Sequence, residues 1–309
     1  MTAPDARQAA PWAAGFLAAL VVLLPFDFSA LTGDAWSSRI LIAAVLVANV
    51  WVVGRLPFRI QIVIAWIELA ALFALFFWSF NLSYAYIWSR LPYLVGTELN
   101  RGFLIGAALT LFICFVAIAV STIIALIAAL ARLSGNGIAV GIATFYISFF
   151  RGTPLLLQIL LIYLGLPQLG VVLTPVPSAI IALSLCYGAY MAEIFRAGIQ
   201  AIPAGQTEAA RALGLKPGQI MRLVILPQAI RLIIPPTGNQ FIAMLKDSSL
   251  VSVLGAWDLM YMARTHGKAE FKYVEMLIAA AVIYWILSMA FEAVQARIER
   301  HYGKGVAAR

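Results

Sequence analysis

The stretch from residue 202 to residue 217, IPAGQTEAARALGLKP, decides how this sequence is interpreted. It is polar, and it separates two apolar runs that are each long enough to span a membrane. A segment of this polarity lies outside the hydrocarbon of a bilayer, where another protein can touch it. It also predicts two short helices, because its alanine-rich part favours helix, Pro203 and Pro217 suit first helical turns, and Gly214 permits a positive φ. We therefore expect a helix–glycine–helix element between two membrane spans.

The composition of the chain indicates a polytopic membrane protein. Of its 309 residues, 63% are hydrophobic and 11% are charged, and the mean hydropathy is +0.97. A soluble domain has about a quarter charged residues, so this apolar excess is too large for a soluble core. The net charge of +8 does not predict nucleic-acid binding, because the basic residues are scattered at the ends of apolar runs, where orientation signals lie.

Eight apolar runs predict eight membrane spans, since a spanning helix needs about 20 residues. The first run is short and ends at Pro25 and Asp27, so a cleaved signal peptide is the alternative interpretation. Against that alternative, only Arg7 precedes the run, and no small-x-small site follows it. The predicted spans are 10–26, 39–54, 61–80, 103–131, 138–165, 177–199, 220–245 and 273–296.

We predict four parts along the chain: a three-span extension over 1–80, an extracytoplasmic interfacial connector over 81–100, a five-span core over 101–297 and a cytoplasmic tail over 298–309. The polar loop near 200–219 is expected in the cytoplasm. Alternation then places both termini in the cytoplasm, with 12 Lys and Arg inside and 7 outside. This excess agrees with the tendency of cytoplasmic segments to be basic.

The polar loop has a recognisable pattern: Glu208 begins an EAA triplet, three residues precede Gly214, and nine more precede Val224, which starts a V-x-L-P. This pattern resembles the coupling loop of bacterial ABC importer permeases, in which isoleucine usually stands where Val224 does. With its neighbours, it makes residues 96–297 similar to the polar amino acid permease family, which includes histidine and glutamine permeases. The neighbouring blocks are FRGTP at 150–154, YGAYMAEIFRAG at 187–198, LPQAIR at 226–231 and PPTGNQ at 235–240.

The resemblance implies an all-α polytopic fold of the type I ABC importer permease class, with a five-helix core and about three added N-terminal transmembrane helices. It implies a subunit that moves a polar amino acid across the bacterial inner membrane by alternating access. The implied partners are two ABC ATPase subunits, a second permease subunit (identical or related), an extracytoplasmic amino-acid-binding protein and membrane lipid. ATP and Mg would be used by the partner ATPase, because this chain has no GxxxxGKS/T phosphate loop.

The resemblance also implies which loop residues contact the ATPase. Glu208 complements the dipole of a short helix, and solvated capping is the alternative interpretation. Small alanines would let this helix approach the ATPase closely, and the glycine would set the angle between the two arms. The implied coupling residues are Glu208, Ala209, Ala210, Gly214 and Pro227.

A charged residue, Arg151, falls near the middle of the run 138–165. Such a group usually faces a protein cavity, and the glycine and proline beside it predict a helix break of the kind that builds substrate sites. We expect Arg151 to contact a substrate carboxylate or to brace Glu193, and snorkelling or pairing within the bundle is the alternative. The residues expected to line the same region are Thr153, Pro154 and Gln158.

The run 177–199 carries Tyr187, Tyr190 and Glu193, which are three residues apart and share one helix face. In lipid this face must point into the bundle, either to contact an ammonium group, to pair with Arg151 or to form a structural polar seam.

The run 220–245 contains Pro227, Pro235 and Pro236, which predict a bent or broken helix. The polar residues Asn239 and Gln240 follow the break and are expected to line the pathway.

The remaining reactive residue types predict no chemistry in this chain. Cys114 and Cys186 lie inside apolar runs and are expected to be buried small hydrophobes. His266 and His301 are isolated, so neither a metal site nor a catalytic cluster is predicted. An ion-gradient-driven secondary transporter remains the main alternative, although it leaves the helix–glycine–helix loop unexplained. A membrane-embedded enzyme would need a cluster of His, Asp or Glu at catalytic spacing.

Overall fold

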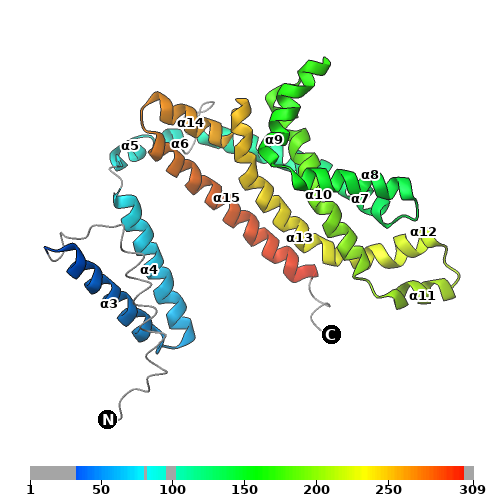
Figure 1. Ribbon diagram of the computed structural model, residues 1–309, viewed down its shortest axis with the longest axis horizontal. Helices are drawn as coiled ribbons and strands as arrows, with labels where there is room; N and C mark the ends of the chain where they lie inside the picture. The colour runs from blue at the N-terminus through cyan, green and yellow to red at the C-terminus, as the bar shows by residue number, and fades with distance from the viewer. Residues whose placement is uncertain (1–32, 80–81, 95–101, 303–309) are drawn as a thin grey trace, which may run out of the picture. The chain divides into compact units, whose positions relative to one another are not determined.

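The computed structural model describes residues 33–79, 82–94 and 102–302, and these residues form helices and turns without a strand (Figure 1). The chain divides into two units between Leu82 and Ser83. The predicted all-α fold is therefore confirmed over the described ranges.

The first unit contains a pair of apolar helices, α3 (Ala35–Val53) and α4 (Phe58–Ser79). Asp34 caps α3 with its carboxylate. Most of the large apolar side chains of both helices are exposed, as expected where lipid is the solvent. A polar contact joins the pair, because Asn49 Nδ2 donates to Glu68 Oε1 at 2.8 Å.

The second unit, from Ser83 onward, contains the core helices. They begin with two short helices and continue with long helices separated by short turns (Figure 1). Their bounds are α5 (Tyr84–Ser89), α6 (Leu91–Leu94), α7 (Phe103–Leu133), α8 (Gly137–Gly152), α9 (Leu155–Leu160), the π-helix η1 (Leu161–Gly165), the 3₁₀-helix η2 (Leu166–Leu169), α10 (Pro175–Gln200), α11 (Ala204–Ala212), α12 (Pro217–Ile220), the π-helix η3 (Met221–Ile225), α13 (Leu226–Asp247), the 3₁₀-helix η4 (Ser248–Leu254), α14 (Leu259–Ala269) and α15 (Tyr273–Tyr302).

Six stretches of the described chain are helical, long and apolar enough to cross a membrane, and a seventh span results if the bent pair α8 and α9 is counted as one. These seven correspond to the second through eighth predicted spans. The first predicted span, 10–26, lies outside the described residues.

The core is organised around the packing of α7 on α10. Small side chains bring the two backbones close, as is usual in membrane helices. Ser121 Oγ donates to Ser184 O at 3.1 Å, and Ser184 Oγ donates to Ala117 O at 3.3 Å. Hydroxyl groups in this interface therefore find backbone partners inside the bundle.

Helix α13 is continuous through Pro235 and Pro236, so of the predicted bend or break the break is excluded. Two side chains bond to carbonyls around the prolines: Gln295 Nε2 donates to Pro235 O at 2.6 Å, and Thr237 Oγ1 donates to Ile233 O at 2.8 Å. The prolines remove the N–H donors of Arg231 O and Leu232 O, and α13 nevertheless stays helical through both positions, with Gln295 bonded to Pro235 O. An irregularity does occur earlier, in the π-turn η3 that leads into α13.

Candidate functional site

The polar loop folds as the predicted helix–glycine–helix element, which we call the coupling segment (residues 203–227). Helix α11 ends at Ala212, and Gly214, two residues later, has a φ of +77°. Leu215 N donates to Ala210 O at 3.2 Å and Gly214 N donates to Arg211 O at 2.9 Å, the two bonds of a Schellman motif. The backbone therefore caps α11 by itself and sets the direction in which α12 leaves.

One face of α11 is available to another molecule. Glu208 and Ala209 are exposed, and Leu213 is 82% exposed. Ala210 is buried in the chain's own core, so its small size seats α11 on the bundle, and the expectation that it approaches the ATPase is corrected. Gln228 Nε2 on α13 donates to Gln206 Oε1 at 3.1 Å, which ties α11 to the membrane helices.

The predicted break beside Arg151 is present. Thr153 is extended, at φ −114° and ψ 146°, as the residue before a proline prefers, and α8 and α9 meet at 107°. Gln158 Nε2 donates to Phe150 O at 2.9 Å and to Thr153 O at 3.1 Å. Because Gln158 is only 3% exposed, it braces the break and is not an exposed lining residue. Pro154, by contrast, is exposed.

Arg151 is exposed at the end of α8. Its guanidinium carbon lies 5.4 Å from the ring centroid of Tyr190, within cation–π range. The rings of Tyr190 and Tyr187 are 6.3 Å apart, and Tyr187 donates to Asp247 Oδ2 at 2.7 Å. A guanidinium, two aromatic rings and a carboxylate thus follow one another from α8 across α10 to α13. Asp247 is not among the site residues predicted from the sequence, because it is 60 residues from Tyr187 along the chain.

Glu193, one turn beyond Tyr190 on α10, makes its ion pairs with other arginines. Arg196 Nη2 is 2.7 Å from Glu193 Oε2, and Arg132 Nη1 is 3.7 Å from Glu193 Oε1. Among the described residues the ion-pair partners of Glu193 are thus Arg196 and Arg132, and Arg151 makes no ion pair with it. The spacing of three residues could have identified Arg196, whereas Arg132 is on another helix.

Asn239 and Gln240 occupy the middle of α13, with Asn239 exposed and Gln240 half-buried. In the part of the chain that the structure describes, neither side chain hydrogen-bonds to Arg151, Tyr187 or Tyr190. The structure therefore does not gather all the predicted pathway residues into one cluster.

Helix α14 begins at a buried carboxylate. Asp258 Oδ2 accepts a hydrogen bond from Met260 N at 3.1 Å, whereas Oδ1 is buried without a hydrogen-bond partner in the described chain. Burial raises the pKa of Asp258 to about 7. On the same helix, burial lowers the pKa of His266, which contacts the hydroxyl of Tyr93.

The cysteines Cys114 and Cys186 are buried and unpaired, as predicted. Within the described ranges no group of three or more His, Cys, Asp and Glu could hold a metal ion.

Comparison with known proteins decides the family. The sequence model described as "Binding-protein-dependent transport system inner membrane component" matches residues 121–304. The chain belongs to this family. It is thus a membrane-spanning permease subunit of the ABC importer class.

Curated relatives resemble this permease over most of their own lengths. The arginine transport system permease protein ArtQ of Bacillus subtilis (strain 168) is 42% identical over 63% of this chain and 90% of the relative. The glutamine transport system permease protein GlnP of Escherichia coli (strain K12) is 35% identical over 69% and 94%. The arginine transport system permease protein ArgU of Corynebacterium glutamicum is 38% identical over 78% and 80%. The match to ArgU covers 78% of the chain, which is a larger share than the second unit, Ser83–Arg309, makes up.

Solved structures show the same fold. The crystal structure of an amino acid ABC transporter with histidines aligns with a TM-score of 0.63 and 40% identity, over 68% of this permease and 98% of that chain. The MetNI methionine ABC transporter aligns with a TM-score of 0.53 at 22% identity, over 63% and 91%.

Proposed function

We propose that this permease carries a polar amino acid across the bacterial inner membrane and is driven by a separate ATPase that docks on the coupling segment. The observation that carries the proposal is the geometry of that segment, in which an exposed short helix is followed by a left-handed glycine and is tied back to α13. Relatives named as arginine and glutamine permeases support the choice of substrate class.

Two such permeases, identical or related, would form the pathway, and two ATPase subunits would bind their coupling segments. A binding protein would deliver the amino acid from outside. Closure of the ATPases would move α11 as a rigid body, and the contact from Gln206 to Gln228 would transmit this motion to α13. The pathway would then alternate between the two sides. ATP and Mg would bind to the ATPases and not to this chain.

The series from Arg151 to Asp247 suits a zwitterion. In our proposal the Arg151 guanidinium contacts the substrate carboxylate, and Asp247 with Tyr187 contacts the ammonium group. Thr153 and Pro154 place Arg151 at the break, and Tyr190 orients its guanidinium. Asn239 and Gln240 would line the path further along α13.

Cysteine crosslinking tests the docking of the ATPase. Ala209→Cys places a thiol on the exposed face of α11, and both native cysteines are buried. We expect Ala209→Cys to crosslink to the ATPase, and to react with a membrane-impermeant thiol reagent only after the cells are opened. The control is Val172→Cys, which is 80% exposed near the opposite end of α10. It should react in intact cells and give no ATPase crosslink. The reverse labelling pattern would refute the orientation, with both termini in the cytoplasm, as well as the docking.

Uptake into proteoliposomes tests the energy source. Transport of labelled arginine or glutamine should require ATP, the ATPase and the binding protein. Uptake driven by a proton or sodium gradient without ATP would instead establish the secondary transporter.

A further inference from the structure

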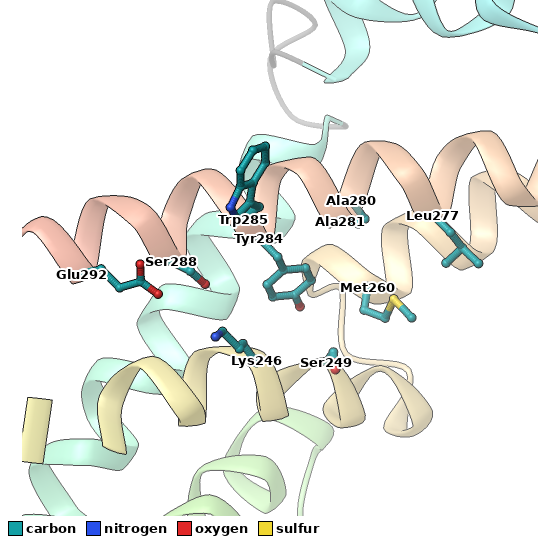
Figure 2. A pocket seen from close by; sticks show the side chains of 10 residues that line it. All are labelled: Lys246, Ser249, Met260, Leu277, Ala280, Ala281, Tyr284, Trp285, Ser288 and Glu292. Carbon is teal, nitrogen blue, oxygen red and sulfur yellow. The ribbon is translucent and has the colours of Figure 1, made fainter. Parts of the chain in front are cut away.

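Two hollows lie beside α14, and their charges differ. The first has a volume of about 700 Å³, and a cation and an anion, Lys246 and Glu292, both line it (Figure 2). The second has a volume of about 660 Å³, and its lining includes two cations and no carboxylate. We call this second hollow the cationic groove. Its polar lining residues are Ser252, Tyr261, Arg264, Thr265, Lys268 and Tyr273.

The two cations of the groove are displayed by one face of α14. Tyr261, Arg264, Thr265 and Lys268 follow the spacing i, i+3, i+4 and i+7, which places side chains on the same side of a helix. Arg264 Nη1 donates to Ser252 Oγ at 3.4 Å, across the groove from η4. Arg264 and Lys268 are exposed, and neither forms an ion pair in the part of the chain that the structure describes.

The carboxylates closest to the groove in sequence are engaged elsewhere. The Glu270 carboxylate pairs with Arg90 at 2.7 Å, and Glu275 pairs with Lys272 at 3.5 Å. Asp258 is buried at the start of α14, where it caps the helix. The groove therefore presents two positive charges and several hydroxyl groups to whatever enters it.

The groove lies at the end of the bundle opposite the coupling segment. Leu133, at one end of α7, packs on the cluster that contains Ala210. At the other end, the Tyr93 ring contacts both Phe103 and His266 of α14, with centroid distances of 5.9 Å and 4.5 Å. The 31 residues of α7 rise about 45 Å, or about 34 Å at 40° of tilt. Both values exceed the roughly 30 Å of hydrocarbon, so the second half of α14 lies beyond it.

Aromatic side chains surround the groove. Tyr261 and Tyr273 line it, and the ring of Trp257, which is 63% exposed, lies 5.9 Å from the Tyr261 ring. Phe271, between the lining residues Ala269 and Tyr273, is 95% exposed with a φ of +54°, a conformation unfavourable for phenylalanine. Arginine and aromatic residues together are typical of the centre of a protein–protein interface. This composition therefore favours a protein as the occupant.

We propose that the cationic groove docks a carboxylate-bearing surface of the extracytoplasmic binding protein. The inference rests on the proposed function, and the description of the family as binding-protein-dependent supports the choice of partner. Arg264 and Lys268 pair with carboxylates of the partner, and Trp257 covers apolar surface beside them. An anionic phospholipid also satisfies the two cations, but its acyl chains cannot enter a groove that lies beyond the hydrocarbon. A free phosphate leaves the exposed aromatic rings uncovered.

Association kinetics test the groove. The complete importer, with its ATPase in a lipid nanodisc, is offered the amino-acid-loaded binding protein encoded beside the permease gene, at low and at high salt. Because charges at an interface steer the encounter, Lys268→Gln should lower the association rate constant at least threefold at low salt. Arg264→Gln combined with Lys268→Gln should lower it at least tenfold and flatten its salt dependence. The matched control is Lys272→Gln, which removes an outer cation that Glu275 already neutralises, and it should stay within twofold of wild type.

Several results would overturn the proposal. One is a wild-type association rate in the double variant, and another is an equal loss in Lys272→Gln and Lys268→Gln. A double variant that binds the partner normally but loses phosphatidylglycerol in native mass spectrometry would assign the groove to lipid. Trp257→Ala should raise the dissociation rate constant at least threefold, and it provides the test if thermal unfolding shows that the double variant fails to fold.

The same measurement separates the two proposals. If the wild-type importer does not bind the binding protein at all, the proposed function fails and this inference fails with it. If the wild-type importer binds the partner and the groove substitutions change nothing, only this inference fails. Lys268→Arg, which keeps the charge, should bind within twofold of wild type, and a loss as large as that of Lys268→Gln would show that charge is not what the partner recognises.

Discussion

The coupling segment and the break at Thr153 and Pro154 both turn a helical chain sharply, but they satisfy their backbone groups differently. At the end of α11 the carbonyls of Ala210 and Arg211 accept from backbone N–H groups, with Gly214 in the left-handed region. At the break a buried side chain, Gln158, supplies the donors. The first turn is exposed, and a β-carbon at Gly214 would meet nothing within 4 Å.

The difference shows that the surroundings of a turn determine how its backbone groups find hydrogen-bond partners. Where water is present, a glycine that permits the backbone to cap itself is sufficient, and any remaining group can be hydrated. Within hydrocarbon an unsatisfied carbonyl is costly, so a side chain from the next helix fills the role. In α13, Gln295 adds a side-chain hydrogen bond from α15 to Pro235 O. Substitutions at these turns test the comparison.

The largest expected effect is on transport, from Gly214→Asp. A side chain at φ +77° strains the turn by about 1 kcal/mol or more, which would tilt α12 against α11 and uncouple the ATPase. We expect the variant to reach the membrane and to lose at least tenfold in ATP-driven uptake. Gly170→Asp is the control, because Gly170 has φ +84° in open space away from the coupling segment. Wild-type uptake by Gly214→Asp would refute the role of the turn.

The next effect extends the comparison to a helix end that is capped by a buried acid. The raised pKa of Asp258 means that the folded protein holds the proton more tightly than the unfolded chain does. Stability should therefore fall as pH rises from about 4 to about 7, by at most about 4 kcal/mol. Thermal unfolding of the wild type and of Asp258→Asn between pH 4.5 and 8 measures this, and the variant should lack the decline.

Asp34→Asn is the control for that titration. Asp34 also caps a helix, but it is exposed and the hydrogen bond from Ser37 N lowers its pKa. Its contribution is lost only as pH falls below about 4, so the variant should keep the wild-type decline. An equal slope in Asp258→Asn and in the wild type would contradict the assignment.

Removal of the buried Gln158 side chain tests the comparison between the two turns directly. Gln158→Leu leaves the carbonyls of Phe150 and Thr153 without their donor, and we expect a loss of about 2 to 3 kcal/mol in the free energy of unfolding. In the coupling segment Gln219 Oε1 also accepts from a backbone group, Lys216 N at 2.9 Å, but at an exposed position. Gln219→Leu should cost less than about 1 kcal/mol. Equal losses, measured by thermal unfolding, would show that burial does not set the cost.

The smallest expected effect concerns the hydrogen bond from Gln295 to Pro235 O in α13. The Gln295 amide packs directly on Gly238, where a β-carbon would collide with it. Gly238→Ala should displace Gln295 from Pro235 and destabilise the fold by about 1 kcal/mol. In a Gln295→Ala background the same substitution should cost little. If Gly238→Ala costs as much in that background as in the wild type, the brace is not the cause.

Features that depend on neighbouring residues could be predicted from the sequence. They include seven of the spans, the helix–glycine–helix loop and the break before Pro154. Each arises from composition, from the conformational freedom of glycine or from the missing N–H of proline, and these properties act within a few residues.

The packed structure alone decided the remaining contacts. Glu193 could have paired with any nearby cation, and packing gave it Arg196 and Arg132. Tyr187 found Asp247 on another helix, and α13 stays continuous while Gln295, 60 residues away, bonds to Pro235 O. These partners are distant along the chain, and in lipid a polar group takes whichever partner the crossing of two helices brings within reach.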